Sequence, residues 1–327
     1  MIYVNSCQIL DEFLNYKLVI AGGAKSTVDQ YYNDLHLFLI FVKRKNNSIP
    51  DDVGNILIED CDLDFIKSIS RSTIYEYMNY CFDERKNSKR TLARKLSSIK
   101  EFYKYLCIKQ HYLEENPTIG IDTPKYKNGL PKYLRLNECI FLLESVEGKF
   151  KVRDYCILTL FLNCGMRLSE LVGLDVSSLR KADDGSDNYV SVNVIGKGNK
   201  ERMIYLNDAC NYALKDYLNF RSGIVDIIDK NALFISAHKK RINKRQVENI
   251  VKKALNAAQL GDRGLSTHKL RHTAATLMYE HGKVDVRVLK DILGHEQLNT
   301  TQIYTHLSDD KMYNAVNSNP LNKINKK

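Results

Sequence analysis

The sequence lacks any apolar run long enough to cross a membrane. Its longest apolar stretch, residues 155–164, covers only ten residues and contains Asn163, whereas a spanning helix needs about 20. The amino terminus carries no basic segment, and Asp11 and Glu12 interrupt its apolar residues. We therefore expect neither a signal peptide nor a membrane anchor.

Cysteines at metal-binding spacing are also missing. None of the eight cysteines belongs to a Cys-x-x-Cys pair, and the closest two lie eight residues apart. This spacing is unlike a zinc site or a dense disulfide framework. We expect reduced, mostly buried thiols in a cytoplasmic protein that holds no metal through its cysteines.

Proline is scarce, and its placement predicts a domain boundary. Three of the five prolines fall within residues 117–131, and a segment this rich in proline cannot continue a helix. A chain of 327 residues with 44% hydrophobic and 27% charged residues has the composition of a folded protein of about two domains. We expect one domain over residues 1–113, a linker over 114–132 and a second domain over 133–307, followed by a tail over 308–327.

Positive charge exceeds negative charge by ten, and the excess is unevenly placed. The first 120 residues hold 16 basic and 16 acidic side chains, yet residues 85–109 alone hold nine basic residues against Glu101. A polyanion, most commonly nucleic acid, is the partner that such a segment favours. A solvated helix face remains the alternative explanation.

The spacing of apolar residues predicts a mainly helical chain. In the first domain, helices are expected near residues 6–20, 26–45, 60–82 and 88–112. The last is the clearest, because Leu92, Leu96, Ile99, Tyr103 and Leu106 form one stripe. In the second domain, helices are expected near residues 137–147, 151–163, 208–220, 243–257, 267–281 and 284–293. Alternating segments at 189–195 and 201–206 around the tetrapeptide Gly-Lys-Gly-Asn predict a hairpin.

Five short motifs in the second domain carry residues suited to chemistry. They are Gly165-Met-Arg167-Leu-Ser-Glu170, the hairpin lysine Lys197, His268-Lys-Leu-Arg271, Gly294-His295, and Tyr304. Each alone has an ordinary structural explanation, such as a surface ion pair or a packed tyrosine. His268 and His272 have the i, i+4 spacing of metal ligands, but Lys269 stands where a zinc protease has glutamate. We expect no metal there.

The order and spacing of these motifs resemble the tyrosine recombinase (phage integrase) family, most of all its Xer-type members. The resemblance spans nearly the whole chain. It implies a mainly α fold, with a helical, SAM-like core-binding domain before a mostly helical α+β catalytic domain that has a small antiparallel sheet (the DNA breaking-rejoining enzyme fold). It also implies a catalytic set, which in this sequence is Arg167, Lys197, His268, Arg271, His295 and Tyr304.

The chemistry of these residue types fits cleavage of a DNA phosphodiester. Arg167 and Arg271 can hold the non-bridging oxygens and stabilise the transition state. The resemblance makes Tyr304 the nucleophile, which His268 would deprotonate while His295 hydrogen-bonds the phosphate and Lys197 protonates the departing 5′-oxygen. Glu170 would support the site. Such a reaction needs no metal, ATP or other cofactor.

The expected partner is double-stranded DNA with a specific recombination site, and the resemblance implies four protomers on two sites. Expected DNA contacts lie in two basic clusters, Arg90, Arg94, Lys95 and Lys104 in the first domain and Lys239, Lys240, Arg241, Lys244 and Arg245 in the second. The tail would dock on a neighbouring protomer or pack on its own. Two other functions stay open, a type IB topoisomerase-like relaxing enzyme and a non-catalytic DNA-binding or architectural protein.

Overall fold

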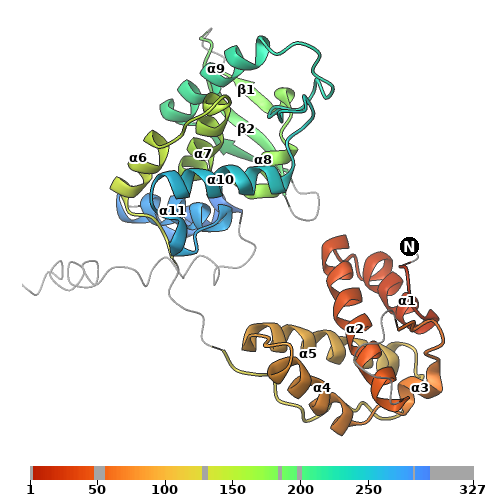
Figure 1. Ribbon diagram of the computed structural model, residues 1–327. Coiled ribbons are helices and arrows are strands. Elements are labelled where there is room, and N and C mark those ends of the chain that lie inside the picture. Colours follow the sequence, from red (N-terminus) through yellow and green to blue (C-terminus); the bar gives the residue numbers. More distant parts are fainter. Residues whose placement is uncertain are drawn as a thin grey trace, which may run out of the picture. The chain divides into compact units, whose positions relative to one another are not determined.

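The computed structural model describes residues 3–47, 56–126, 132–182, 186–196, 201–282 and 284–294. The chain forms two compact units, residues 1–129 and 130–327, and Figure 1 shows the helices and strands of each. Within the described ranges, no helix has both the length and the apolar character that crossing a bilayer requires.

Helices are the only regular elements among the described residues of the first unit (Figure 1). The expected helix over 60–82 is instead two helices, because Asp62 and Ser70 each cap a separate start by accepting a backbone N–H three residues ahead. Two of the helices end in a π-helical turn. The elements are α1 (Gln8–Asn15), η1 (Tyr16–Ile20), α2 (Lys25–Asn46), α3 (Leu63–Lys67), α4 (Arg71–Asp83), α5 (Lys89–Lys104) and η2 (Tyr105–Lys109).

The core of the first unit confirms the stripe expected for its last helix. Leu96, Ile99 and Leu106 are at most 1% exposed and pack among Phe13 and Phe38 of α1 and α2. Burying a side chain of this size contributes roughly 1.5–3 kcal/mol. The stripe therefore holds α5 against α2 and α4 and leaves the opposite side of α5 to solvent.

The segment expected to be a linker starts with residues that pack on the first unit. Thr118 and Ile121 are buried, and Lys100 of α5 donates a hydrogen bond of 2.6 Å to the Ile121 carbonyl. The described part of this segment ends at residue 126 and resumes at 132.

The second unit combines helices with a three-stranded antiparallel sheet in the order β1-β2-β3 (Figure 1). The expected hairpin is confirmed, because β2 pairs with β3 in a register that places Val192 opposite Ile204. The elements are α6 (Leu136–Glu144), α7 (Lys151–Cys164), α8 (Leu168–Gly173), η3 (Val176–Ser178), β1 (Leu179–Lys181), β2 (Tyr189–Ile195), β3 (Glu201–Tyr205), α9 (Asp208–Ser222), α10 (Lys244–Ala257), η5 (Gly261–Arg263), α11 (Thr267–Glu280) and α12 (Val286–Leu293).

Helix α7 is the centre of the second unit. Its residues 156–162 are all buried, and it packs against α9 and α11. It ends at Gly165, whose φ of 60° and ψ of 33° give the left-handed cap expected from the sequence. The chain leaves this cap in extended conformation at Arg167 and turns at once into α8. A rigid, buried helix therefore fixes the position of this turn.

Candidate active site

Arg167 lies at the start of α8, directly after the turn that ends α7. Its backbone N–H donates a hydrogen bond of 2.8 Å to Glu170 Oε2, and its Nη1 donates one of 2.8 Å to Glu170 Oε1. Glu170 thus caps the helix and orients the side chain that precedes it. The Arg167 side chain remains one third exposed, so a ligand can reach it.

Glu170 is a buried carboxylate held between two guanidinium groups. Its side chain has no exposed surface, and it is also paired with Arg202 of β3, which donates through Nη1 to Oε1 and through Nη2 to Oε2 at 3.1 Å. Burial raises the pKa of Glu170, but the hydrogen bonds from Arg202 and Arg167 outweigh burial and leave the pKa below its usual value. Glu170 is therefore a charged support at neutral pH, not a proton donor.

Arg271 brings the ends of two helices together from its place on α11. It is only 2% exposed, and it donates through Nη1 to the Gly165 carbonyl at 2.6 Å and through Nη2 to the Leu293 carbonyl at 2.5 Å. Arg167 donates through Nη2 to the next carbonyl, that of Gly294, at 2.6 Å. Both arginines are thereby anchored on the carboxyl-terminal end of α12, where carbonyls carry partial negative charge.

His268 lies one helical turn before Arg271 on α11. Desolvation by the surrounding protein lowers the pKa of His268, and the positive charges of Arg271, Lys269 and Arg167 lower it further. Its Nε2 lies 3.1 Å from Nε2 of His272, so one of the two rings must be the donor. The imidazole of His268 is therefore neutral and able to accept a proton at neutral pH.

Arg202 is the residue of this site that the motifs did not single out. The sequence could have indicated Arg202, because side chains alternate between the two faces of a strand. Arg202 therefore shares one face of β3 with the buried Ile204. A charged side chain on an inward face normally has a buried partner. The sequence alone does not show that this partner is Glu170, which lies 32 positions earlier in the chain.

Three of the expected catalytic residues, Lys197, His295 and Tyr304, lie outside the described residues. The structure does describe the positions just before two of them. Gly196 follows β2, and Gly294 ends α12 with a φ of 62°. Among the residues that are described, no three His, Cys, Asp or Glu side chains gather in a way that could hold a metal ion.

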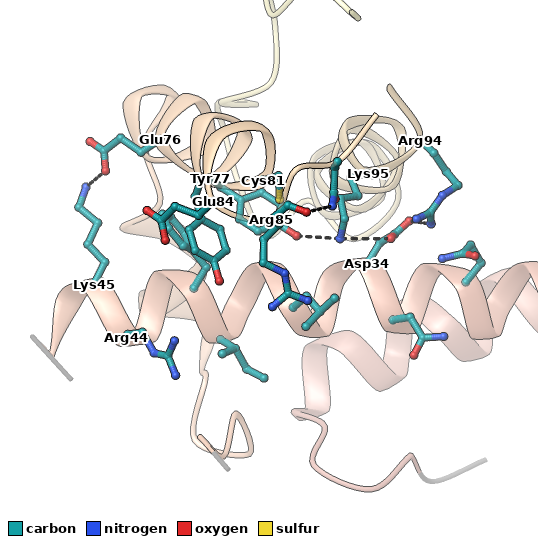
Figure 2. A pocket seen from close by; sticks show the side chains of 17 residues that line it. Asp34, Arg44, Lys45, Glu76, Tyr77, Cys81, Glu84, Arg85, Arg94 and Lys95 are labelled. Atoms are coloured by element: carbon teal, nitrogen blue, oxygen red, sulfur yellow. Dashed lines mark hydrogen bonds and ion pairs between the residues drawn. The ribbon is translucent and has the colours of Figure 1, made fainter. Parts of the chain in front are cut away.

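The basic cluster expected on the first unit is only partly available to DNA. Arg90, Arg94 and Lys104 of α5 are exposed, and Arg94 also pairs with Asp34. Lys95 was expected to contact DNA, and the structure corrects this expectation, because Lys95 is only 6% exposed. Its ammonium points inward beside a cavity of about 670 Å³, 3.2 Å from the Tyr77 hydroxyl and 3.7 Å from Asp34 (Figure 2). Lys95 neutralises the buried Asp34 and is not free to contact phosphate.

The cluster expected on the second unit also divides. Lys240, Lys244 and Arg245 are exposed, and Lys239 has only a long contact of 3.6 Å with the exposed Asp226. The structure also corrects the expectation that Arg241 contacts DNA. Its guanidinium binds Asp175 at 2.5 Å, Asp229 at 3.0 Å and the Leu174 carbonyl at 2.9 Å. These contacts join separate loops of the unit, so Arg241 has a structural role.

Comparison with known proteins identifies the family to which this arrangement belongs. Residues 132–311 match the model of the phage integrase family. The chain is 44% identical to tyrosine recombinase XerC of Caldanaerobacter subterraneus subsp. tengcongensis over 96% of this chain and 87% of that protein. It is 32% identical to tyrosine recombinase XerD of Staphylococcus epidermidis, covering 93% of this chain and 97% of that one.

Solved structures agree with this relationship. The crystal structure of XerA recombinase is 26% identical, covers 95% of this chain and 99% of its own, and superposes with a TM-score of 0.51. XerH bound to palindromic difH substrate has a TM-score of 0.69 at 19% identity, with 95% and 94% of the chains covered, and shares the fold. The chain belongs to the phage integrase family. Within that family it is a site-specific tyrosine recombinase of the Xer type.

Proposed function

We propose that this chain cuts and rejoins double-stranded DNA at a specific site through a 3′-phosphotyrosyl intermediate. The observation that carries the proposal is the pair of guanidinium groups, those of Arg167 and Arg271, anchored on consecutive carbonyls at the end of α12. Glu170, the carboxylate that pairs with Arg167, also pairs with Arg202. Two guanidinium groups held close together suit the negative charge of a phosphodiester.

The proposed cleavage of DNA uses these guanidinium groups together with a nucleophile, a base and an acid. Tyr304 is the proposed nucleophile, but a phenol of pKa ~10 is ionised to only about one part in a thousand at neutral pH. His268, whose pKa is lowered, accepts the phenolic proton as the oxygen attacks phosphorus. The bond from phosphorus to the 5′-oxygen then breaks, and Lys197 gives that oxygen a proton. Arg167, Arg271 and His295 stabilise the charge that develops on the non-bridging oxygens.

The second half of the reaction reverses the first. A 5′-hydroxyl attacks the phosphotyrosyl bond, Tyr304 leaves, and the DNA strand is restored. Because the covalent bond conserves the energy of the broken strand, we propose that no ATP, metal or other cofactor takes part. Arg90, Arg94, Lys104, Lys239, Lys240, Lys244 and Arg245 are the proposed phosphate contacts.

We also propose that four protomers act on two recombination sites in the cytoplasm. The cytoplasmic location rests on the eight cysteines, all of which are free thiols. The tetramer rests on the family and predicts a complex of four chains and two duplexes by light scattering. The tail that would join protomers, residues 308–327, lies outside the described residues.

The test begins by mapping the DNA that the purified protein protects from its own genome. A nicked suicide substrate built on that site should trap a covalent adduct, and Tyr304→Phe should abolish it. Joined strands from two separate sites indicate recombination, whereas relaxation of a supercoiled plasmid without joining indicates a topoisomerase. Site-specific protection without any adduct would leave only the non-catalytic, DNA-binding function.

A further inference from the structure

Arg202 makes contacts that exceed those of an ordinary strand residue. Its side chain is only 16% exposed, and both of its terminal nitrogens donate to Glu170, one to each carboxylate oxygen. This two-pronged geometry fixes the plane of the carboxylate as well as its position. Glu170 therefore cannot rotate without breaking the pair.

The carboxylate that Arg202 fixes is the one that orients Arg167. Glu170 accepts four hydrogen bonds, two from Arg202 and two from Arg167. The Arg167 guanidinium divides its donors between Glu170, through Nη1, and the Gly294 carbonyl, through Nη2. Arg202 thus carries part of the pairing that the buried carboxylate requires and leaves Arg167 free to reach α12.

Arg202 also contacts the end of α12 directly. A Cβ atom placed on Gly294 would lie 3.0 Å from Cδ and Nε of Arg202 and 3.2 Å from its Cζ. The guanidinium therefore packs against the backbone whose carbonyl Arg167 binds. The backbone of Arg202 in β3 lies opposite Val194 of β2 in the antiparallel register. This pairing fixes the position of Arg202 beside α8 and α12.

We propose that Arg202 is a positioning residue for DNA cleavage, which acts by holding Glu170 so that Arg167 stays on the Gly294 carbonyl. This inference rests on the proposed function, and it gives Arg202 no contact with the substrate. Without Arg202, the buried carboxylate pairs with Arg167 alone, draws that guanidinium toward itself and away from Gly294, and misplaces it for the phosphate.

The first measurement is the single-turnover rate of adduct formation on the nicked substrate at saturating protein. We expect Arg202→Gln to slow cleavage by roughly 10- to 100-fold, as a displaced catalytic group does. Arg202→Lys keeps the charge but loses the fork and should fall between Arg202→Gln and wild type. The control is Arg263→Gln, which removes the same charge and breaks an Arg–Glu pair of 2.5 Å to Glu138. The Arg263→Gln variant should cleave at the wild-type rate. If Arg202→Gln also cleaved at the wild-type rate, the proposal would be overturned.

A double-mutant cycle separates positioning through Glu170 from independent effects. Glu170→Gln and Arg202→Gln should each slow cleavage, and the double variant should be little slower than the worse single variant. Rates that multiply would contradict the proposal, because they would mean that Arg202 acts without Glu170. Melting temperatures measured in parallel identify any variant that fails to fold.

A modified substrate tests whether the effect passes through Arg167. When sulfur replaces the scissile 5′-oxygen, the leaving thiolate needs no proton, so Lys197→Gln should recover its cleavage rate. Arg202→Gln should not recover, because its defect lies in stabilising the phosphate. Recovery by Arg202→Gln would overturn the assignment to Arg167.

A crystal structure of Arg202→Gln keeps this inference separate from the proposed function. We expect Arg167 Nη2 to have left the Gly294 carbonyl, whether or not the protein forms an adduct. An unmoved Arg167 would refute the positioning role, while a wild-type protein that forms no adduct would refute the proposed function alone.

Discussion

Replacing Gly165 by alanine tests the turn on which the candidate active site is built. Gly165 has a φ of +60°, and an added Cβ would lie 2.9 Å from Cδ2 of Leu293, 3.5 Å from Cβ of Ala274 and 3.8 Å from Cγ of Arg271. The left-handed conformation costs an L-residue roughly 1–2 kcal/mol. Overpacking against Leu293 adds about 1–3 kcal/mol, so we expect a loss of about 2–5 kcal/mol in total.

Gly264→Ala is the matched control for Gly165→Ala. Gly264 belongs to the same unit and has a φ of +64°, but its added Cβ would meet only Nζ of Lys132, at an ordinary 3.6 Å. We expect this variant to lose the conformational part alone, about 1–2 kcal/mol. The difference between the two variants therefore measures the contact with α12.

Both variants can be compared by thermal unfolding of the full chain, followed by far-ultraviolet circular dichroism. For a unit of this size, each kcal/mol lowers the melting temperature by roughly 2–4 °C. Gly165→Ala should melt several degrees below Gly264→Ala and should cleave DNA more slowly, since Leu293 and Arg271 must move. Equal melting temperatures would show that α12 does not pack on this turn as described.

Three further predictions concern single groups. The pKa of His268, followed by NMR in the DNA-free protein, should lie below the usual value of about 6.5, because burial and nearby positive charges lower it; a value at or above 6.5 would contradict the surroundings described for this side chain. Asp34→Ala should cost about 3–5 kcal/mol in urea unfolding, because it leaves the buried ammonium of Lys95 without its carboxylate partner. Asp60→Ala removes a carboxylate that is largely exposed and should cost at most about 1 kcal/mol; similar losses would contradict the buried network. The double variant Lys244→Gln, Arg245→Gln should reduce the salt dependence of DNA binding by roughly two phosphate contacts, and an unchanged slope would exclude α10 from the interface.

The parts of the fold that depend on local sequence were predictable. The apolar stripe of α5, the hairpin of β2 and β3 and the left-handed cap at Gly165 follow from residues a few positions apart. The split between α3 and α4 was missed, although Ser70 is a residue that commonly starts helices. An apolar periodicity that continues across a short break hides such a start.

Contacts between distant residues were not predictable from local patterns. Lys95 reads as one more basic residue of α5, and only the fold brings it to Asp34, 61 positions earlier in the chain. Arg241 likewise meets Asp175 through loop packing. Arg202 and Glu170 show the same limit within the site, because their pairing depends on how β3 lies beside α8. The spacing of the motifs identifies residues of the types that the chemistry needs. The fold determines which charged side chains are paired with each other and which are available to bind DNA.

The most direct test of the proposed phosphotyrosyl intermediate is to find which residue carries the DNA. The trapped adduct can be digested with nuclease and trypsin and then sequenced by mass spectrometry. Cleavage after Lys290 and Lys311 releases a peptide that contains Tyr304 as its only tyrosine. We predict that the remaining nucleotide is attached to that peptide at Tyr304. A nucleotide on any other residue would contradict it.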